Sequence, residues 1–403
     1  MNVTTTTPGF AGASGKSSPI RQMFEKGLEL KAKFGADAVC DFSLGNPDLP
    51  PPPEAKEALL EIASRSGDRF AFGYCPNAGL PEAREAVAAR ISREQGVAVA
   101  ASGVVLTCGA AGALVSLFRA TVSHGDEVVV PCPYFVEYAN YCGHFGGLLK
   151  PVATGDGFAL DIDALERAVT ARTCVILLNS PNNPTGAIYS EDEIAAVGAL
   201  VERVNVERLS RGEKALLLVS DEPYRDFAYD GAQTPSVMRH CKWAVVAGSF
   251  SKSLSLAGER IGYVAPNPRL SREDGGALLD ALALANRTLG FVNAPIVGQR
   301  LAAALAGTSP DIAVYGRRRA AMARVLDDAG IRYAMPKGAF YFFPETPGGD
   351  DARFIDALLA ERILAVPGAQ FGMGGHFRLS YSVGEEVIAR SASGFKRAAE
   401  KCR

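Results

Sequence analysis

Short apolar segments alternate with longer amphipathic ones through the middle of the chain. Six apolar segments are rich in Val, Leu, Ile and Ala and are bounded by turn-forming residues, the pattern of buried strands. These six cover residues 104–109, 127–133, 174–181, 215–224, 244–250 and 260–266. Segments of helical character lie between several of them, such as 112–126 and 190–209, and Ser190 followed by Glu193 indicates a capping box. This alternation predicts an α/β fold with a mainly parallel central sheet covered by helices.

The pattern of apolar and polar residues changes toward the C-terminus. An amphipathic helix is predicted over 316–330, and the short aromatic or apolar runs at 339–344, 363–368 and 376–382 have Pro-Gly punctuation. These features predict a smaller α+β domain. We expect residues 1–45 to form an N-terminal lead-in and part of the small domain. Residues 46–300 then form the large domain, and 301–403 complete the small one.

The amino-acid composition argues against nucleic acids and membranes as binding partners. The 403 residues include 42 basic and 44 acidic side chains, so the net charge is close to zero. Such a chain offers no basic field for nucleic acid or an anionic membrane. No apolar run approaches the roughly 18 residues that cross a bilayer. The expected partners are small molecules or another copy of the chain.

The eight cysteines form no C-x-x-C pair, and several lie in apolar runs. Buried reduced thiols favour a cytoplasmic location over a disulfide framework. The four histidines are scattered without an H-x-x-H pattern, so the sequence predicts no metal site.

Polar residues follow three of the predicted strands. Asn183, Asp221 and Lys252 fall at the C-terminal ends of these apolar runs, at the edge where ligands bind in open α/β sheets. Lys252 stands in the serine-rich stretch SFSKSLSLAGER, and a lysine in a dry pocket is a candidate amine nucleophile.

Each of these signals also has a plainer structural explanation. Asn-Asn-Pro-Thr-Gly around Asn183 is turn chemistry by itself, and Asp221 can cap a helix. The turn TCGAAGAL at 107–114 is either an anion site at a helix start or a packing contact. Arg378 in FRLSYS either pairs with a structural acid or binds a planar anion. The residues alone leave these alternatives open.

Taken together, the motifs resemble the class I/II aminotransferases of fold type I, the aspartate aminotransferase-like enzymes that use pyridoxal 5′-phosphate (PLP). Asn-Pro-Thr-Gly, Asp-x-x-Tyr, Ser-x-x-Lys with an arginine eight residues later, and a late strand arginine occur in the family's order. The resemblance runs from SLGNPD at 43 to FRLSYS at 382. It implies a large PLP-binding domain and a small domain.

The resemblance also implies a role for each matching residue. Lys252 corresponds to the lysine that forms the Schiff base and shuttles the proton, and Asp221 to the partner of the pyridine nitrogen. Further cofactor contacts are implied for Ala110, Ala111, Phe135, Asn183, Tyr224, Ser249, Arg260 and, from the neighbouring subunit, Tyr74. Catalytic roles fall to Lys252, Asp221 and Tyr224. Substrate contacts fall to Gly45, Asn183 and Arg378.

The chain departs from the family pattern at two places. The phosphate turn reads Gly-Ala-Ala where relatives often carry a polar side chain, and the stacking residue is Phe135 where tryptophan or tyrosine is common. These departures put one phosphate contact in doubt and should alter the electronics of the ring modestly.

The implied function is transfer of an amino group between an L-amino acid and a 2-oxo acid by a ping-pong aldimine/ketimine mechanism, within amino-acid metabolism. The alternative is another PLP-dependent reaction on the same scaffold, such as β-elimination or decarboxylation. A homodimer is expected from the role of Tyr74. For substrate selection, Arg287 is one candidate, and Tyr138 and Phe24 are alternatives that would line an aromatic or aliphatic pocket.

Overall fold

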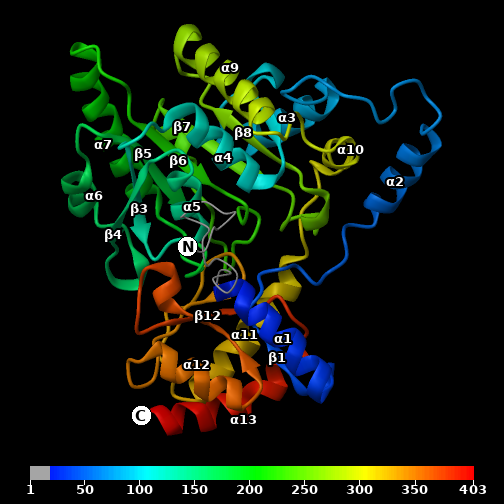
Figure 1. Ribbon diagram of the computed structural model, residues 1–403, viewed down its shortest axis with the longest axis vertical. Helices are drawn as coiled ribbons and strands as arrows, with labels where there is room; N and C mark the ends of the chain where they lie inside the picture. The colour runs from blue at the N-terminus through cyan, green and yellow to red at the C-terminus, as the bar shows by residue number, and fades with distance from the viewer. Residues whose placement is uncertain (1–18) are drawn as a thin grey trace, which may run out of the picture. The chain divides into compact units, whose positions relative to one another are not determined.

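The computed structural model describes residues 19–403 and divides the chain into two compact units (Figure 1). Among the described residues, unit 1 combines 19–45 with 314–335 and 340–403, and unit 2 comprises 46–313 and 336–339. Of the segment 1–45 that the sequence predicts as lead-in and part of the small domain, residues 1–18 lie outside the described residues. The sequence places the last boundary at 300, whereas residues 301–313 belong to unit 2, where α10 (Ile296–Leu305) packs on α2 and α3.

Unit 2 is built on a seven-stranded sheet of order β2-β8-β7-β6-β5-β3-β4. Its strands are β2 (Val105–Thr107), β3 (Glu127–Cys132), β4 (Leu148–Ala153), β5 (Thr173–Asn179), β6 (Leu217–Asp221), β7 (Ala244–Ser249) and β8 (Gly262–Pro266). Only β8 runs antiparallel to its neighbours, so the predicted α/β fold with a mainly parallel sheet is confirmed. The sequence pattern missed β4 because this edge strand is half exposed and includes Lys150 and Pro151.

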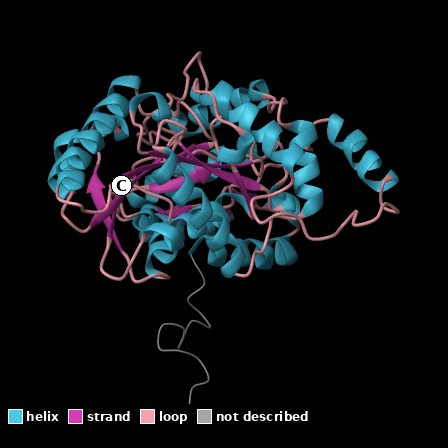
Figure 2. Ribbon diagram, turned by 90° about the horizontal axis from the view of Figure 1, so that it is seen from above, coloured by secondary structure: helices cyan, strands magenta, loops and turns pink. Residues whose placement is uncertain are grey.

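Helices cover this sheet, as Figure 2 shows with cyan helices along both faces of the magenta strands. The helices of unit 2 are α2 (Glu54–Ser64), α3 (Pro81–Gln95), α4 (Gly109–Thr121), α5 (Glu137–Gly143), α6 (Ile162–Ala168), α7 (Glu191–Ser210), α8 (Val237–His240), α9 (Arg272–Thr288) and α10, of which α2 packs on α10. The predicted capping box is present at the start of α7, where Ser190 and Glu193 satisfy each other's backbone N–H groups. Within residues 19–403, every helix is too short or too polar to cross a lipid bilayer.

Unit 1 is a small α+β unit. Its helices are α1 (Pro19–Phe34), α11 (Ile312–Asp328), α12 (Asp351–Ala360) and α13 (Glu385–Cys402). Strands β1 (Cys40–Asp41) and β10 (Ile363–Leu364) pair in parallel, and β11 (Val366–Pro367), β12 (Phe377–Ser380) and β9 (Tyr341–Phe342) form an antiparallel sheet in that order. The β1–β10 pair therefore joins the N-terminal part of the chain to its C-terminal part.

The strand directions bring several chain segments to one edge of the large sheet. Strands β2 and β7 both run antiparallel to β8, so they run in the same direction as β6, β5 and β3. Gly262 at the start of β8 pairs with Thr107 at the end of β2 and with Ser249 at the end of β7. Asp221 pairs with Asn179 at the end of β5. The carboxyl ends of these strands form the platform for the site.

Candidate active site

Asp221 is the last residue of β6, and its carboxylate is buried. One carboxylate oxygen, Oδ2, accepts a 2.5 Å hydrogen bond from the hydroxyl of Tyr138. The other, Oδ1, is buried and has no hydrogen-bond partner among the described residues. Burial raises the pKa of Asp221, the Tyr138 hydrogen bond lowers it and the neighbouring Glu222 raises it, which leaves it at about 7. A buried carboxylate with one unsatisfied oxygen is a site for a cation.

Tyr138, on α5, is completely buried and donates its hydroxyl proton to Asp221. Its pKa lies well above the usual value because of burial and the adjacent carboxylate, so it remains a donor. Tyr138 is therefore a support for Asp221. This differs from the predicted role as a wall of a substrate pocket, because its hydroxyl is committed to the carboxylate.

The segments that follow β5 and β6 lie side by side. Asn179, at the end of β5, donates from Nδ2 to the backbone oxygen of Asp221 and accepts from the backbone N–H of Asn183. Asn183 and Tyr224 are both buried at this edge. Asn179 is not among the predicted site residues, although its place near the end of an apolar run was the available signal.

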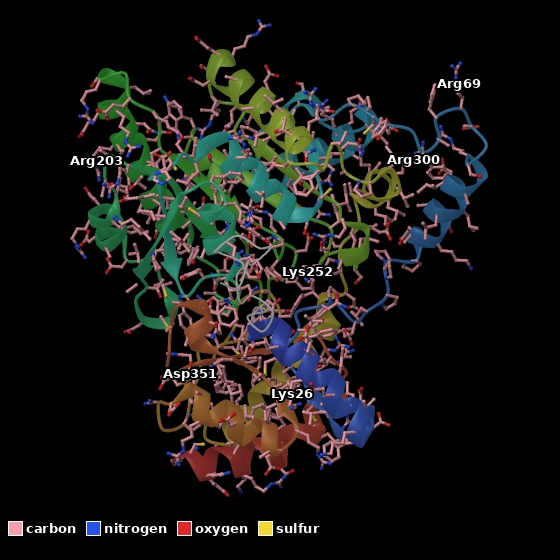
Figure 3. The ribbon with its side chains drawn as sticks, in the orientation of Figure 1. Lys26, Arg69, Arg203, Lys252, Arg300 and Asp351 are labelled. Atoms are coloured by element: carbon pink, nitrogen blue, oxygen red, sulfur yellow. The ribbon has the colours of Figure 1, made fainter. Side chains whose placement is uncertain are left out.

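Lys252 lies in the turn that follows β7 and is half-buried (Figure 3). Its neighbours Ser251 and Ser253 are buried, as are Phe250 and Leu254. Lys252 thus lies in a chain segment of small and apolar residues, at the same edge of the sheet as Asp221.

The turn after β2 has the features of an anion site. Ala110 and Ala111 lie in the first turn of α4, where backbone N–H groups have no partner within the helix. The Arg260 guanidinium donates to the backbone oxygen of Cys108 at 3.4 Å and to that of Ala257 at 3.0 Å. Arg260 therefore brings a positive charge to the start of α4.

Two glycines permit this close approach. A Cβ on Gly109 would lie 2.7 Å from Arg260 Nη2, and one on Gly262 would lie 2.5 Å from the backbone carbon of Gly109. Gly262 therefore excludes a side chain because the contact is with backbone, and Gly109 disfavours one because its φ is +72°. Ser249, paired with Gly262, is buried beside them. The turn, Ser249 and Arg260 together form a compact, electropositive cradle.

The predicted aromatic cofactor residues Phe135 and Tyr74 differ in their surroundings. Phe135 follows β3 and packs edge-on against Tyr138, with ring centroids 5.5 Å apart. Tyr74, in contrast, is 92% exposed in the segment between α2 and α3. Phe70 and Phe72 in the same segment are also exposed, at 74% and 58%.

The two predicted substrate residues of unit 1 lie against a common neighbour. Arg378 on β12 is buried, donates from Nη2 to the backbone oxygen of Ser43 at 2.5 Å and lies over the ring of Tyr341 at 4.8 Å from its centroid. A Cβ on Gly45 would lie 1.8 Å from the Tyr341 hydroxyl. Gly45 therefore has to be glycine, and Tyr341 links it to Arg378.

The structure thus gathers most of the predicted cofactor residues at one edge of unit 2 and both Gly45 and Arg378 in unit 1. Arg287 is exposed in the last turn of α9, and Phe24 lies on α1. Neither position tests a role in substrate selection, so both remain predictions.

Comparisons with known proteins identify the family of the chain. The sequence profile described as "Aminotransferase class I and II" matches residues 37–394. The chain is 33% identical to a probable aspartate/prephenate aminotransferase of Aquifex aeolicus, over 96% of this chain and 97% of that protein. It is 31% identical to the aspartate/prephenate aminotransferase of Thermus thermophilus, over 92% and 93%.

Solved structures give the same result. An amino transferase from Eubacterium rectale superimposes with a TM-score of 0.93 at 34% identity, over 99% of this chain and 100% of that one. The aspartate aminotransferase of Thermus thermophilus with maleate superimposes with a TM-score of 0.86 at 29% identity, over 98% and 100%.

Proposed function

The chain belongs to the class I and II aminotransferases, which are PLP-dependent transaminases, and on this premise we propose that its amino donor is aspartate, with a 2-oxo acid as acceptor. The names of the relatives support aspartate as the donor. The roles of individual residues and the assembly of the enzyme are part of the same proposal.

The observation that carries the proposal is the unsatisfied oxygen of Asp221. A protonated pyridine nitrogen is a cationic N–H donor, which is what Oδ1 lacks among the described residues. Such a donor also stabilises the ionised carboxylate, whose pKa of about 7 shows that burial disfavours its charge. The residues present therefore fit the ring of PLP.

The cradle at the start of α4 fits the cofactor's phosphate. The helix start supplies backbone donors at Ala110 and Ala111, Arg260 supplies charge and Ser249 supplies a hydroxyl. Because the side chains at 110 and 111 are methyl groups, the backbone and Arg260 have to provide most of the binding. Phe135 is proposed to stack on the ring, and Asn183 and Tyr224 to donate to its phenolic oxygen.

When bound, PLP acts as an electron sink for the bonds at the substrate's α-carbon. Lys252 Nζ is the proposed attachment point and the base that takes a proton from the α-carbon and returns it. Arg378 and the backbone of Gly45 are proposed to orient the α-carboxylate, with Arg378 held rigid by Ser43 and Tyr341.

A homodimer is proposed to complete the site. Tyr74, Phe70 and Phe72 expose large aromatic surfaces, and a groove on α2 is lined by residues such as Pro52, Leu59 and Leu60. Figure 1 shows α2 and the segment after it at the rim of unit 2. Exposed apolar surface of this extent is typical of an interface, and a second copy is the occupant that would place Tyr74 in a neighbouring site. A reducing, cytoplasmic location agrees with the eight free thiols.

The central experiment is a half-reaction. L-Aspartate added to the PLP-loaded enzyme should discharge the cofactor's visible absorbance and release one equivalent of the corresponding 2-oxo acid. Release of ammonia instead would identify elimination, and no reaction with aspartate but turnover with another amino acid would refute the proposed donor.

Lys252 is tested independently of turnover. Borohydride reduction of the loaded enzyme should leave a cofactor mass adduct on the peptide that contains Lys252. The adduct should be absent in Lys252→Ala and retained in Lys242→Ala, which changes an exposed lysine just before the other end of β7. An adduct elsewhere would overturn the assignment.

The dimer is tested by sedimentation at assay concentration. We expect two chains per particle. In Tyr74→Phe, we expect weaker PLP binding, measured as a higher dissociation constant. A fully active monomer would contradict a site completed by a second copy.

A further inference from the structure

A cavity of about 220 Å³ lies within unit 1, where the turn between α12 and β10 meets β1 and α13. Figure 1 shows α13, in red, running beside α12. None of the residues proposed to bind PLP or substrate lines this cavity. Its chemistry is therefore separate from the function proposed above.

The cavity wall carries more positive than negative charge. Three arginines line it, against Asp37 and Glu361. Glu361 is already paired with Arg397, whose Nε lies 3.0 Å from Glu361 Oε2. Arg362, Arg390 and Asp37 remain. Both arginines are exposed, and neither has a carboxylate within 4 Å among the described residues.

The neighbours of Arg362 and Arg390 do little to neutralise the charge of the two guanidinium groups. Arg390 lies beside the buried thiol of Cys40, and both residues line the cavity. Arg362 lies 5.4 Å from the ring centroid of Phe34. The hydroxyl of Ser393 is a further donor on the wall. Two guanidinium groups and a hydroxyl around one small space form a donor set for an oxyanion.

The backbone at Arg362 gives a second, independent observation. Its φ is +58°, in the left-handed region, directly after the C-cap residue of α12. This is the position at which helices usually have glycine, because a side chain there carries a steric cost. Strain of this kind persists at ligand sites, where the side chain has a use. The backbone oxygen of Arg362 also accepts from Cys40 N–H at 2.9 Å, which fixes its position on the wall.

We propose that this cavity binds a small phosphate-bearing anion through Arg362, Arg390 and Ser393. With Asp37 and Glu361 on the same wall as the three arginines, the lining has a net charge of +1. A tetrahedral oxyanion offers enough acceptor oxygens for both guanidinium groups and the Ser393 hydroxyl at once. The volume is below that of pockets for drug-sized ligands, which excludes nucleotides. Free phosphate and a small phosphate monoester share the required chemistry.

The test uses the PLP-loaded enzyme, so that the cofactor's own phosphate site is filled. Thermal unfolding is followed while inorganic phosphate is added, with chloride at equal ionic strength as the reference. A ligand of the folded state raises the midpoint in a saturable way. We expect such a rise with phosphate in the wild type and at least a tenfold weaker response in Arg390→Gln. Arg332→Gln, which removes a guanidinium from another exposed position of unit 1, should respond like the wild type.

Arg362→Gly separates ligand binding from structure. Glycine suits the left-handed backbone, so without phosphate the variant should melt at the wild-type temperature or above it, yet lose the phosphate response. A lower midpoint without phosphate would assign Arg362 a structural role and overturn the proposal. A wild-type phosphate response in Arg390→Gln would overturn it as well.

A parallel titration with glycerol phosphate identifies the source of the phosphate group. Tighter binding than inorganic phosphate would indicate a monoester, and equal binding would indicate the free anion. Equal effects of phosphate and chloride would reject the site. The aspartate half-reaction depends on neither arginine, so failure here leaves the proposed function intact.

Discussion

Asp221 and Glu127 are two buried carboxylates at opposite edges of the same sheet, with opposite chemistry. Both are 5% exposed or less. Glu127, at the start of β3, is bonded to Thr170, Arg172 and Lys150. Burial would raise its pKa, but these partners lower it to about 2. Asp221 has Tyr138 on one oxygen only, and its pKa is about 7.

The two carboxylates have different roles at the two edges of the sheet, the amino edge, where the parallel strands start, and the carboxyl edge, where they end. At the amino edge, the charges of Arg172 and Lys150 and the Thr170 hydroxyl satisfy Glu127, so the carboxylate stabilises the fold. At the carboxyl edge, an oxygen is left unsatisfied, which costs stability in the cofactor-free chain. That cost is recovered when a cation binds. A buried carboxylate whose oxygens all have hydrogen-bond partners indicates a structural role. A buried carboxylate with an unsatisfied oxygen indicates a binding site for a ligand.

The largest expected effect is on catalysis by Asp221→Asn. The neutral amide no longer stabilises a positive charge on the pyridine nitrogen, so kcat with aspartate should fall by roughly 10²–10³-fold, the range seen when one pre-organised electrostatic group is removed. Steady-state kinetics at saturating PLP measures this. Glu127→Gln, assayed well below its unfolding temperature, should keep kcat within about twofold. An equal loss in both variants would remove the distinction between the two edges.

The same Asp221→Asn substitution should stabilise the cofactor-free chain. The folded-state pKa of Asp221 is raised from 3.8 to about 7, so the folded state holds its proton more tightly than the unfolded state. The contribution of Asp221 to the free energy of unfolding is therefore fully present below pH 4. It falls as the pH rises to about 7 and is constant above that. The shift corresponds to a difference of up to about 4 kcal/mol at pH 8.

Urea unfolding of both cofactor-free proteins between pH 4 and 8 measures this difference. The variant should be more stable at pH 8, and the two curves should converge near pH 4. A variant that is less stable at pH 8 would show that the orphaned oxygen carries no cost.

Glu127→Gln should have the opposite effect on stability. The folded-state pKa of Glu127 is lowered from 4.5 to about 2, so its contribution is present above pH 4.5 and is lost as the pH falls toward 2. The substitution should destabilise the chain by about 3 kcal/mol at pH 7. Acid titrations of the two proteins should converge near pH 2. A constant difference across that range would assign the loss to packing instead of charge.

The sequence predicted the strands and the polar residues at their ends because both are short-range patterns. Apolar runs of five to seven residues mark buried strands, and parallel strands bring Asn183, Asp221 and Lys252 to one edge. The hydrogen-bond partner of Asp221 could not be predicted from the sequence, because Tyr138 lies 83 residues earlier in the chain. Such a contact depends on how α5 packs over the sheet, and no local pattern encodes it. The exposed edge strand β4 was missed for the related reason that its pattern is set by solvent on one side.

The smallest predicted effect tests this unpredicted contact. Tyr138→Phe keeps the ring packed against Phe135 but removes the hydroxyl that donates to Asp221. A hydrogen bond to a charged acceptor contributes about 1.5 kcal/mol, which corresponds to about one pH unit. Because this bond lowers the pKa of Asp221, its loss should raise that pKa above about 7. The pH at which cofactor-free stability levels off should then move about one unit higher. At pH 7, PLP affinity should weaken about fivefold because less of the carboxylate is ionised. Tyr134→Phe removes a hydroxyl from the preceding loop and should leave both values unchanged. If the Tyr138→Phe curve superimposes on the wild-type curve, the hydrogen bond does not set the charge of Asp221.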